Sequence, residues 1–433
     1  MITTTLRGGT ARNKISPPPG IYLMGYGNRV QGNLGVHDEL YVTTLVVDDG
    51  ATRAALLTVD HAFLHPTVVD QLKMRLPDIA AEALFVCCSH THAGPIGYAD
   101  ARSRPTDRDY MRFLVDQLVA SVHQASDRLE PVTLLMGTDQ ASININRRER
   151  QPDGQIIIGN NPEGPVDHLV QVLQLRSRTT NHLLATLVNY ACHPVVMGPQ
   201  NRLASADWVG GMRRGVEAMF GGYCLFVQGA TADVNPRQMH WAVDNWVELE
   251  AQGAQVAAAV KRAADKMLPL PAGPIEGRQS ICWLPLETAP ANYDLLRVWL
   301  AAGPTDDAIR AALFSVFPWQ VTVEMRYGIP HSPLSTGVLR IGDWALAALG
   351  TEPFTETGFA LRAASPAHVT FVAGYTNGCN SYLPVRSSYG EGGYELSSAP
   401  MFYGLPAGFA SGGAERVVAE VLRLFNTTGQ SSN

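Results

Sequence analysis

Several apolar runs in this chain stop at residues of the types that can bind metals. LFVCCSHTHAGP stops at His90 and His92, LVNYACHP at His193, ALAALGTEP at Glu352 and CLFVQGATADVNP near Asp233. Each stop stands before a proline or a Gly-Pro break. In open α/β sheets, ligands bind beyond the strand ends, where loops converge on a rigid frame. The pattern therefore favours an α/β fold in which these residues meet at one edge.

Taken singly, each of these residues has an ordinary explanation. A lone histidine at a strand end is more often hydrogen-bonded to the backbone, and Glu352 could begin a helix, because carboxylates favour helix N-termini. The His-x-His spacing of His90 and His92 is more specific, since residues two apart on a strand share a face. Two histidines and one glutamate are also the protein ligands of hydrolytic zinc enzymes, in which zinc lowers the pKa of a bound water to about 7.

Apolar periodicity predicts mixed β-sheet layers with flanking helices. Strands are expected at 39–49 and 52–61 across a D-D-G turn, and at 83–90, 132–146, 168–175, 182–193, 336–350 and 368–378. Helices are expected at 66–76, 108–129, 245–268, 354–364 and 412–425. We expect a single domain over 1–433. The least regular segment, 270–334, is expected to contain a helix at 305–319 and to shape a pocket.

Composition narrows the class of function. The 433 residues are 46% hydrophobic and 17% charged, with a net charge of −6 and no basic stripe, which argues against a nucleic-acid partner. No apolar run is long enough to span a membrane, and the N-terminal residues lack the apolar core of a secretory leader. We therefore expect a cytoplasmic protein with six reduced cysteines. A homo-oligomer is compatible with the sequence.

The motifs and their flanks, in order, resemble the neutral ceramidase family, the neutral/alkaline non-lysosomal amidohydrolases. The resemblance is carried by MGYGNRVQGNLGVHDELY, SHTHAGPIGY, ININRR, NYACHPVVM, SADWVGG, FVQGATADVNP, GTEPFTETG and GCNSYLPVRSSYGEGGYE. It covers nearly the whole chain and implies the catalytic domain of that family. From the sequence we expect neither the family's secretion signal nor its C-terminal β-sandwich domain.

The resemblance implies four zinc ligands, namely His90, His193, Glu352 and Tyr382. Tyr382 would be an unusual neighbour for zinc, because its phenol has a reference pKa near 10; it could ligate as phenolate or donate to an oxyanion. Without the resemblance, Tyr382 would be interpreted as an ordinary turn residue.

The resemblance also implies a set of catalytic residues. His92 would face the substrate and polarise a carbonyl or shuttle a proton. Arg147 would contact the substrate, and Tyr394 would stabilise the tetrahedral oxyanion. We expect Arg148, the neighbour of Arg147, to be a solvated surface charge.

Two aspartates and two glycines are assigned supporting roles. Asp207 and Asp233 are expected to orient the histidines through hydrogen bonds. The glycines of Gly25–Gly27 are expected to let the backbone approach the substrate closely.

The chain departs from the family at the residue assigned there as the nucleophilic serine, since Asn235 stands in its place. An amide cannot attack a carbonyl, so the attacking group would be zinc-activated water. We therefore expect a zinc-dependent hydrolase of a carboxamide bond whose substrate is a soluble N-acyl compound rather than long-chain ceramide. The alternatives are an esterase or lactonase using the same site, a catalytically silent small-molecule binding protein, and a non-hydrolytic use such as amide formation.

Overall fold

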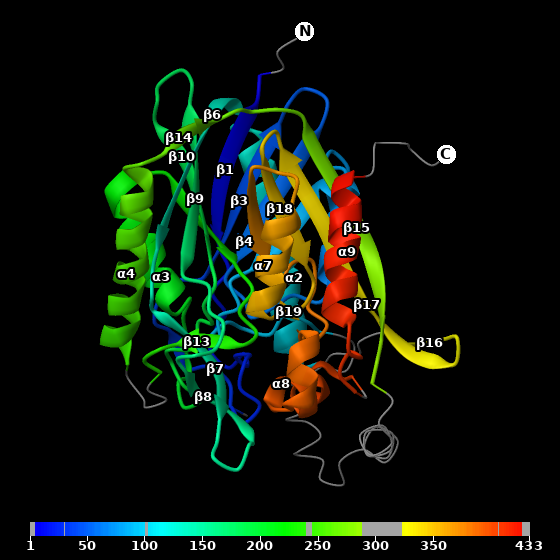
Figure 1. Cartoon of the computed structure of the whole chain (residues 1–433). Coiled ribbons are helices and arrows are strands. Elements are labelled where there is room, and N and C mark those ends of the chain that lie inside the picture. The colour runs from blue at the N-terminus through cyan, green and yellow to red at the C-terminus, as the bar shows by residue number, and fades with distance from the viewer. Residues whose placement is uncertain are drawn as a thin grey trace.

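The computed structural model describes residues 5–29, 31–99, 103–239, 245–287, 323–405 and 407–426. Within them, two β-sheets pack face to face, and helices cover the outer face of each sheet (Figure 1). This architecture confirms the predicted α/β class with mixed sheet layers and flanking helices.

The larger sheet is built mainly from strands of the N-terminal half of the chain. Its strand order is β12 (Tyr223–Gln228), β10 (Leu183–Tyr190), β9 (Leu169–Ser177), β6 (Glu130–Gln140), β1 (Arg7–Lys14), β3 (Tyr41–Asp48), β4 (Arg53–Val59) and β5 (Leu84–Cys88), with β14 (Leu268–Leu270) on β6. The pairs β10–β12 and β4–β5 are parallel, whereas β3–β4 is the antiparallel hairpin predicted from the D-D-G turn. The strands that precede the histidines therefore lie in this sheet.

The second sheet is built from the C-terminal half. Its order is β15 (Ile275–Pro285), β17 (Ile329–Ile341), β18 (Trp344–Leu349) and β20 (Val369–Ala373), with β16 (Glu324–Arg326) on β17. β18 and β20 are parallel. Short sheets join the loops at the strand ends: β13 (Val234–Pro236) with β7 (Asn144–Arg150) and β8 (Ile156–Asn161), β19 (Glu352–Pro353) with β21 (Tyr382–Leu383), and β11 (Leu203–Ala204) with β2 (Gly35–Val36).

Helices cover both outer faces. On the larger sheet, α2 (Pro105–Ser126) packs on β1 and β3, α4 (Trp246–Ala264) on β6 and β9, and α3 (Trp208–Phe220) on β12. On the second sheet, α7 (Thr355–Ala364) packs on β20 and α9 (Gly413–Asn426) on β15 and β17. The remaining elements are α1 (Pro66–Arg75), α8 (Tyr394–Ser397) and the 3₁₀ helices η1 (Ala81–Ala83), η2 (Arg386–Gly390) and η3 (Ala399–Tyr403).

Burial on both faces explains the continuous apolar runs. In β5, Phe85 and Cys87 point into the core between the sheets, whereas Val86 and Cys88 point into the core on the other side of the strand. Successive strand residues face opposite sides, so a strand covered on both needs apolar residues throughout. The run LFVCC therefore marks a fully covered strand and can end abruptly at polar residues.

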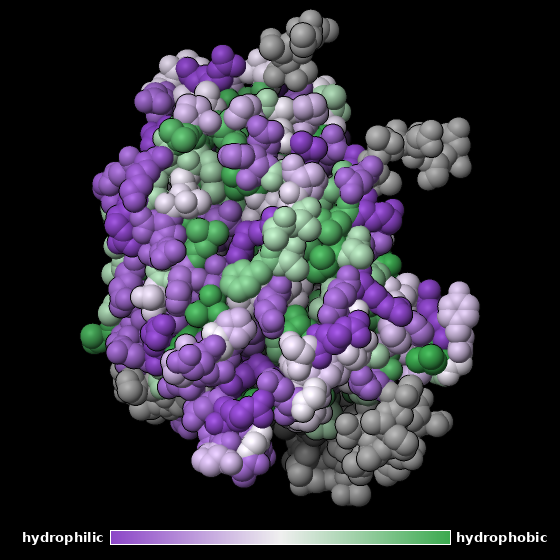
Figure 2. All heavy atoms as spheres, viewed as in Figure 1, coloured by the Kyte–Doolittle hydropathy of each residue, from purple (hydrophilic) through white to green (hydrophobic). Residues whose placement is uncertain are grey.

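The expected helices and strands within the described residues all have counterparts in the structure. The helix expected at 305–319 lies outside the described residues. All six cysteines are described and none forms a disulfide. Figure 2 shows a largely hydrophilic face crossed by a hydrophobic band over α7 and α9. Phe359 of α7 is exposed. No helix in the described ranges is long and apolar enough to cross a bilayer.

Candidate active site

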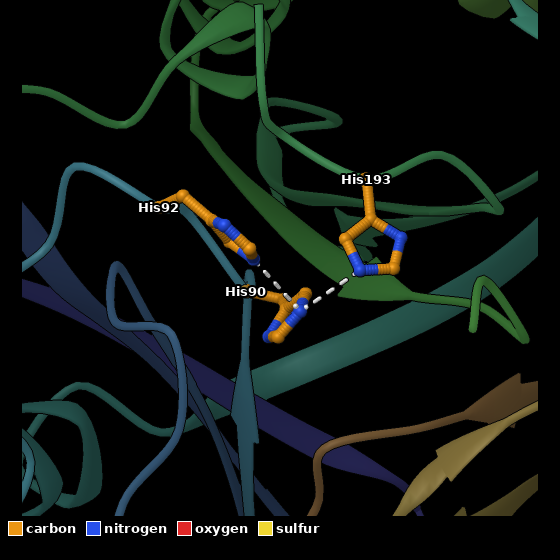
Figure 3. Close-up of side chains that lie close together, drawn as sticks. All are labelled: His90, His92 and His193. Carbon is orange, nitrogen blue, oxygen red and sulfur yellow. Dashed lines mark hydrogen bonds between the residues drawn. The ribbon is translucent and has the colours of Figure 1, made fainter. Parts of the chain in front are cut away.

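Three histidines from two strand ends converge at one point. His90 and His92 follow β5, and His193 follows β10. Figure 3 shows the three rings pointing toward one another from these separate segments. The Nε2 atoms of His90 and His193 are 3.1 Å apart, and the Nε2 atoms of His90 and His92 are 3.2 Å apart. His90 has a φ of 65°, an uncommon backbone conformation for a non-glycine residue that is often found at functional sites.

The proton positions on two of these rings follow from their other contacts. Nδ1 of His90 lies 2.9 Å from the Ala62 carbonyl, and Nδ1 of His193 lies 2.9 Å from the Val234 carbonyl. A carbonyl only accepts hydrogen bonds, so each Nδ1 carries the proton, and the Nε2 of a neutral ring then presents a lone pair. Burial lowers the pKa of His90 to about 3 and also lowers that of His193, so both rings are neutral near pH 7.

Glu352 brings a negative charge to the same point. Its Oε2 lies 3.5 Å from Nε2 of His90 and 3.4 Å from Nε2 of His193, and its side chain is buried. Burial alone would raise the pKa of the Glu352 carboxyl, but the imidazoles and the Tyr403 hydroxyl outweigh it and lower that pKa below its usual range. The carboxylate is therefore ionised.

The donor set fits a divalent metal. Two nitrogen lone pairs and a carboxylate oxygen, 3.1–3.5 Å apart and buried together, repel one another unless a cation lies between them. Tetrahedral ligands about 2.0–2.1 Å from zinc would be about 3.3 Å apart, which matches these separations. The site thus has the chemistry and the spacing of a zinc or similar centre.

Tyr382 lies beside Glu352 through strand pairing. The short parallel pair β19–β21 places Glu352 opposite Tyr382, and the guanidinium of Arg147 is 5.5 Å from the Tyr382 ring centre. The rings of Tyr382 and Tyr394 meet edge to face at 5.7 Å. Burial and the charge of Glu352 raise the pKa of the Tyr382 phenol well above its ordinary value. The three predicted residues Arg147, Tyr382 and Tyr394 therefore form one wall of the site.

His92 differs from the other two histidines. Its Nδ1 is buried and has no hydrogen-bond partner among the described residues, so no contact fixes the proton on that atom. Burial, with the neighbouring rings and arginines, lowers the pKa of His92 well below its usual value. The His92 ring packs against Gly25, which has a φ of 104°. A Cβ atom added to Gly25 would lie only 2.3 Å from Cγ of His92. Gly25 thus makes room for the His92 ring.

The two arginines of β7 are both buried, and the prediction for Arg148 is wrong. The Nε of Arg147 donates to Glu395 Oε1 at 2.9 Å, and Nη1 of Arg148 donates to Glu395 Oε2 at 2.7 Å. Arg147 Nη1 also donates to the Asn235 side chain at 3.4 Å. The side chain of Arg148 is only 6% exposed, because the carboxylate of Glu395 on α8 draws it inward. Glu395 therefore fixes the direction of Arg147.

Asp207 and Asp233 were expected to hydrogen-bond the histidine rings, and that prediction is wrong. Asp233 accepts from the main-chain N–H and the hydroxyl of Thr355 at 2.8 and 2.9 Å, and from Asn146 at 3.1 Å. Asp207 caps α3 and accepts main-chain N–H groups, including that of Trp208 at 2.8 Å. The acceptors for the rings are main-chain carbonyls instead, so the two aspartates support the loops around the histidines.

A cavity of about 440 Å³ opens beside this cluster. It is lined by His90, His92, Arg147, Glu352, Tyr382, Tyr394, Gly25, Gly27, Asn28, Asn235, Tyr26, Tyr403, Met24, Phe63, Ile158, Val195 and Phe402. Of the eight predicted site residues, six line it, His193 lies behind it against His90 and Glu352, and Asp233 is set back. The described residues of segment 270–334 do not line it, and the rest of that segment, 288–322, lies outside the described residues.

Sequence reasoning missed three residues that contact the site. Tyr375 and Tyr403 donate their hydroxyls to Glu352, and Glu395 holds both arginines. Glu395 follows Tyr394 in the GGYE motif, so the motif could have suggested it. Nothing in the sequence distinguishes Tyr375 or Tyr403 from other core tyrosines.

Comparison with known proteins identifies the family of this chain. The family profile described as "Neutral/alkaline non-lysosomal ceramidase, N-terminal" matches residues 9–268, which include the three histidines and Arg147 but not Glu352. The neutral ceramidase of Drosophila melanogaster is 26% identical over 226 residues, covering 48% of this chain and 32% of that protein. The neutral ceramidase of Pseudomonas aeruginosa is 25% identical over 203 residues, covering 43% of this chain and 29% of that protein.

Solved structures extend the similarity of fold to nearly the whole chain. A ceramidase complexed with C2 superposes with a TM-score of 0.74 at 17% identity, covering 99% of this chain and 77% of the other. The neutral ceramidase structure from P. aeruginosa gives a TM-score of 0.70 at 19% identity, covering 99% and 76%. The profile match spans more than half of the sequence, and the chain belongs to the neutral/alkaline non-lysosomal ceramidase family.

Proposed function

We propose that this protein is a zinc-dependent hydrolase that cleaves the carboxamide bond of an N-acyl compound. One observation carries the proposal: the Nε2 atoms of His90 and His193 and Oε2 of Glu352 lie within 3.5 Å of one another. Tyr382 is the proposed fourth protein ligand. When bound, zinc would act as a Lewis acid and make a water molecule acidic enough to attack at neutral pH.

The chain's own residues supply the proton transfer and the charge stabilisation. His92 lines the cavity, and its Nε2 takes and returns a proton there. Arg147, held by Glu395, and Tyr394 are placed to donate to the carbonyl oxygen as negative charge develops there. Asn235 contributes no nucleophile, so hydrolysis proceeds by direct attack of water without an acyl-enzyme.

The cavity supports a compact substrate. A volume of about 440 Å³ lies in the lower half of the range of about 300–1,000 Å³ that is usual for small-molecule sites. Tyr26, Phe63 and Phe402 give it an aromatic lining that suits an acyl group. We therefore propose a small N-acyl substrate in preference to long-chain ceramide, the compound for which the relatives are named.

Metal analysis with matched histidine variants tests the zinc site. The purified chain should contain one zinc, His193→Ala should lose it, and His182→Ala should keep it, because the side chain of His182 is 54% exposed and outside the cluster. A chain without zinc, or a His193→Ala variant that retains it, would contradict the assignment.

A substrate panel tests the reaction. The panel contains N-acyl amides of increasing acyl length and the matched esters. The short amides should be hydrolysed, and removal of zinc by a chelator should abolish that hydrolysis. Turnover of esters alone would point to an esterase or lactonase. A zinc-loaded chain that hydrolyses neither class would point to a silent binding protein.

A further inference from the structure

The two carboxylate oxygens of Glu352 have different neighbours. Oε2 faces the Nε2 atoms of His90 and His193 and accepts the Tyr375 hydroxyl at 3.1 Å. Oε1 accepts a hydrogen bond from the Tyr403 hydroxyl. Both oxygens thus accept a tyrosine hydroxyl, but only Oε2 also faces the two histidines.

The surroundings of Tyr403 hold its hydroxyl in that place. Its side chain is buried at the end of η3, and its ring centre lies 5.3 Å from that of Phe63 and 6.2 Å from that of Tyr382. The Cys379 thiol is 4.0 Å from the Tyr403 oxygen. A carboxylate oxygen only accepts hydrogen bonds, so the Tyr403 hydroxyl is the donor in this contact.

Such a contact controls how a carboxylate can bind a metal. A carboxylate binds a metal through one or both of its oxygens. A hydroxyl that donates to the oxygen turned away from the histidines engages a lone pair that a metal would otherwise take. Hydrogen-bond partners behind the ligands orient them, and removing one typically lowers metal affinity about 10- to 100-fold. A hydrolytic zinc site also needs one open position, which a second oxygen of Glu352 could fill.

We propose that Tyr403 is a positioning residue that keeps Oε1 of Glu352 away from the metal, so that Glu352 binds through Oε2 alone. Tyr403 acts through Glu352 and leaves a position for water and substrate. The inference rests on the proposed metal site and adds to it the residue that limits how Glu352 binds.

Cobalt(II) binding to the metal-free chain tests this, because the visible spectrum of cobalt reports its coordination number. Tyr403→Phe keeps the ring and removes the hydroxyl. It should weaken cobalt binding roughly 10- to 100-fold in competition with a chelator, and its spectrum should shift toward higher coordination as Oε1 is released. Tyr110→Phe is the control, since the buried Tyr110 hydroxyl donates to the Ile15 carbonyl at 2.9 Å and does not contact Glu352.

The outcomes separate the inference from the proposed function. Wild-type affinity and spectrum in Tyr403→Phe would overturn the role of Tyr403 while leaving the metal site standing. Failure of the unsubstituted chain to bind cobalt would overturn both. A Tyr403→Phe variant that does not fold, judged by urea unfolding without metal, would assign Tyr403 to the core and also overturn the inference. 3-Fluorotyrosine at position 403 retains the hydroxyl and should restore the wild-type spectrum.

Discussion

Replacing Gly25 by alanine should move the His92 imidazole without removing any functional group. A Cβ on Gly25 would lie 2.3 Å from Cγ and 2.6 Å from Cβ of His92, whereas ordinary van der Waals contact begins near 3.4 Å. A rotamer change would move Cγ but not the Cβ of His92, so the overlap at 2.6 Å would persist. His92 must therefore shift by about 1 Å, and shifts of that size can cost about 100-fold in rate.

Gly20→Ala separates this displacement from backbone strain. Gly20 has a φ of 91°, close to the 104° of Gly25, but a Cβ there would meet nothing within 4 Å. Both variants should lose about 1–2 kcal/mol of stability, because a side chain disfavours positive φ. Gly25→Ala should additionally lose about 100-fold in kcat/KM, or about 2.7 kcal/mol of transition-state stabilisation, whereas Gly20→Ala should keep it.

The assay combines urea unfolding, zinc content and kcat/KM on the best amide of the panel. Zinc content should be unchanged in both variants, because His92 is not among the proposed ligands. The argument fails if Gly25→Ala is as active as Gly20→Ala, since the overlap would then have been absorbed away from His92. Loss of zinc in Gly25→Ala would instead make His92 a ligand.

Three further substitutions give distinct outcomes. Glu395→Gln leaves two buried arginines without their carboxylate and should cost about 3–5 kcal/mol of stability in urea unfolding. The control is Glu391→Gln, which should cost under about 1 kcal/mol because the Glu391 side chain is 39% exposed. Equal losses of stability would contradict the burial argument. Asn235→Ser should give no burst of product in rapid mixing, because water is the nucleophile; a burst would show that the site supports an acyl-enzyme. Burial raises the pKa of Asp207 to about 6. The folded chain therefore binds the carboxyl proton of Asp207 more tightly than the unfolded chain does. The resulting gain in stability is complete below about pH 4 and is lost as the pH rises through 6. Asp207→Asn should remove this pH-dependent part of the unfolding free energy, which amounts to up to about 3 kcal/mol. If the unfolding free energy of the variant depends on pH between 4 and 7 as that of the unsubstituted chain does, the role of Asp207 is refuted.

The covered strands could be predicted because their residues are apolar on both faces. In β5 and β10, alternate residues enter different cores, so the sequence shows an unbroken apolar run that ends where the core ends. The histidines stand out against such runs, which is why His90, His92 and His193 could be named before any contact was known. The hairpin of β3 and β4 followed from its local turn in the same manner.

The contacts that orient the site could not be predicted because they join distant segments. Arg148 was expected in solvent, yet it is buried on Glu395, 247 residues away in the chain. The rings of His90 and His193 are fixed by the carbonyls of Ala62 and Val234, and every residue has a carbonyl, so no side-chain pattern marks them. The expectation for Asp207 and Asp233 failed for this reason.

Local sequence patterns were enough to predict the sheet layers and the strand ends and to name candidate metal ligands, because periodicity and turn chemistry act over a few residues. Three contacts became known only from the folded chain: the Nε2 atoms of His90 and His193 face Oε2 of Glu352, Tyr403 donates to Oε1, and Glu395 directs Arg147. Those arrangements depend on which strand ends are brought together by sheet packing, and short-range chemical preferences do not encode which distant groups will meet.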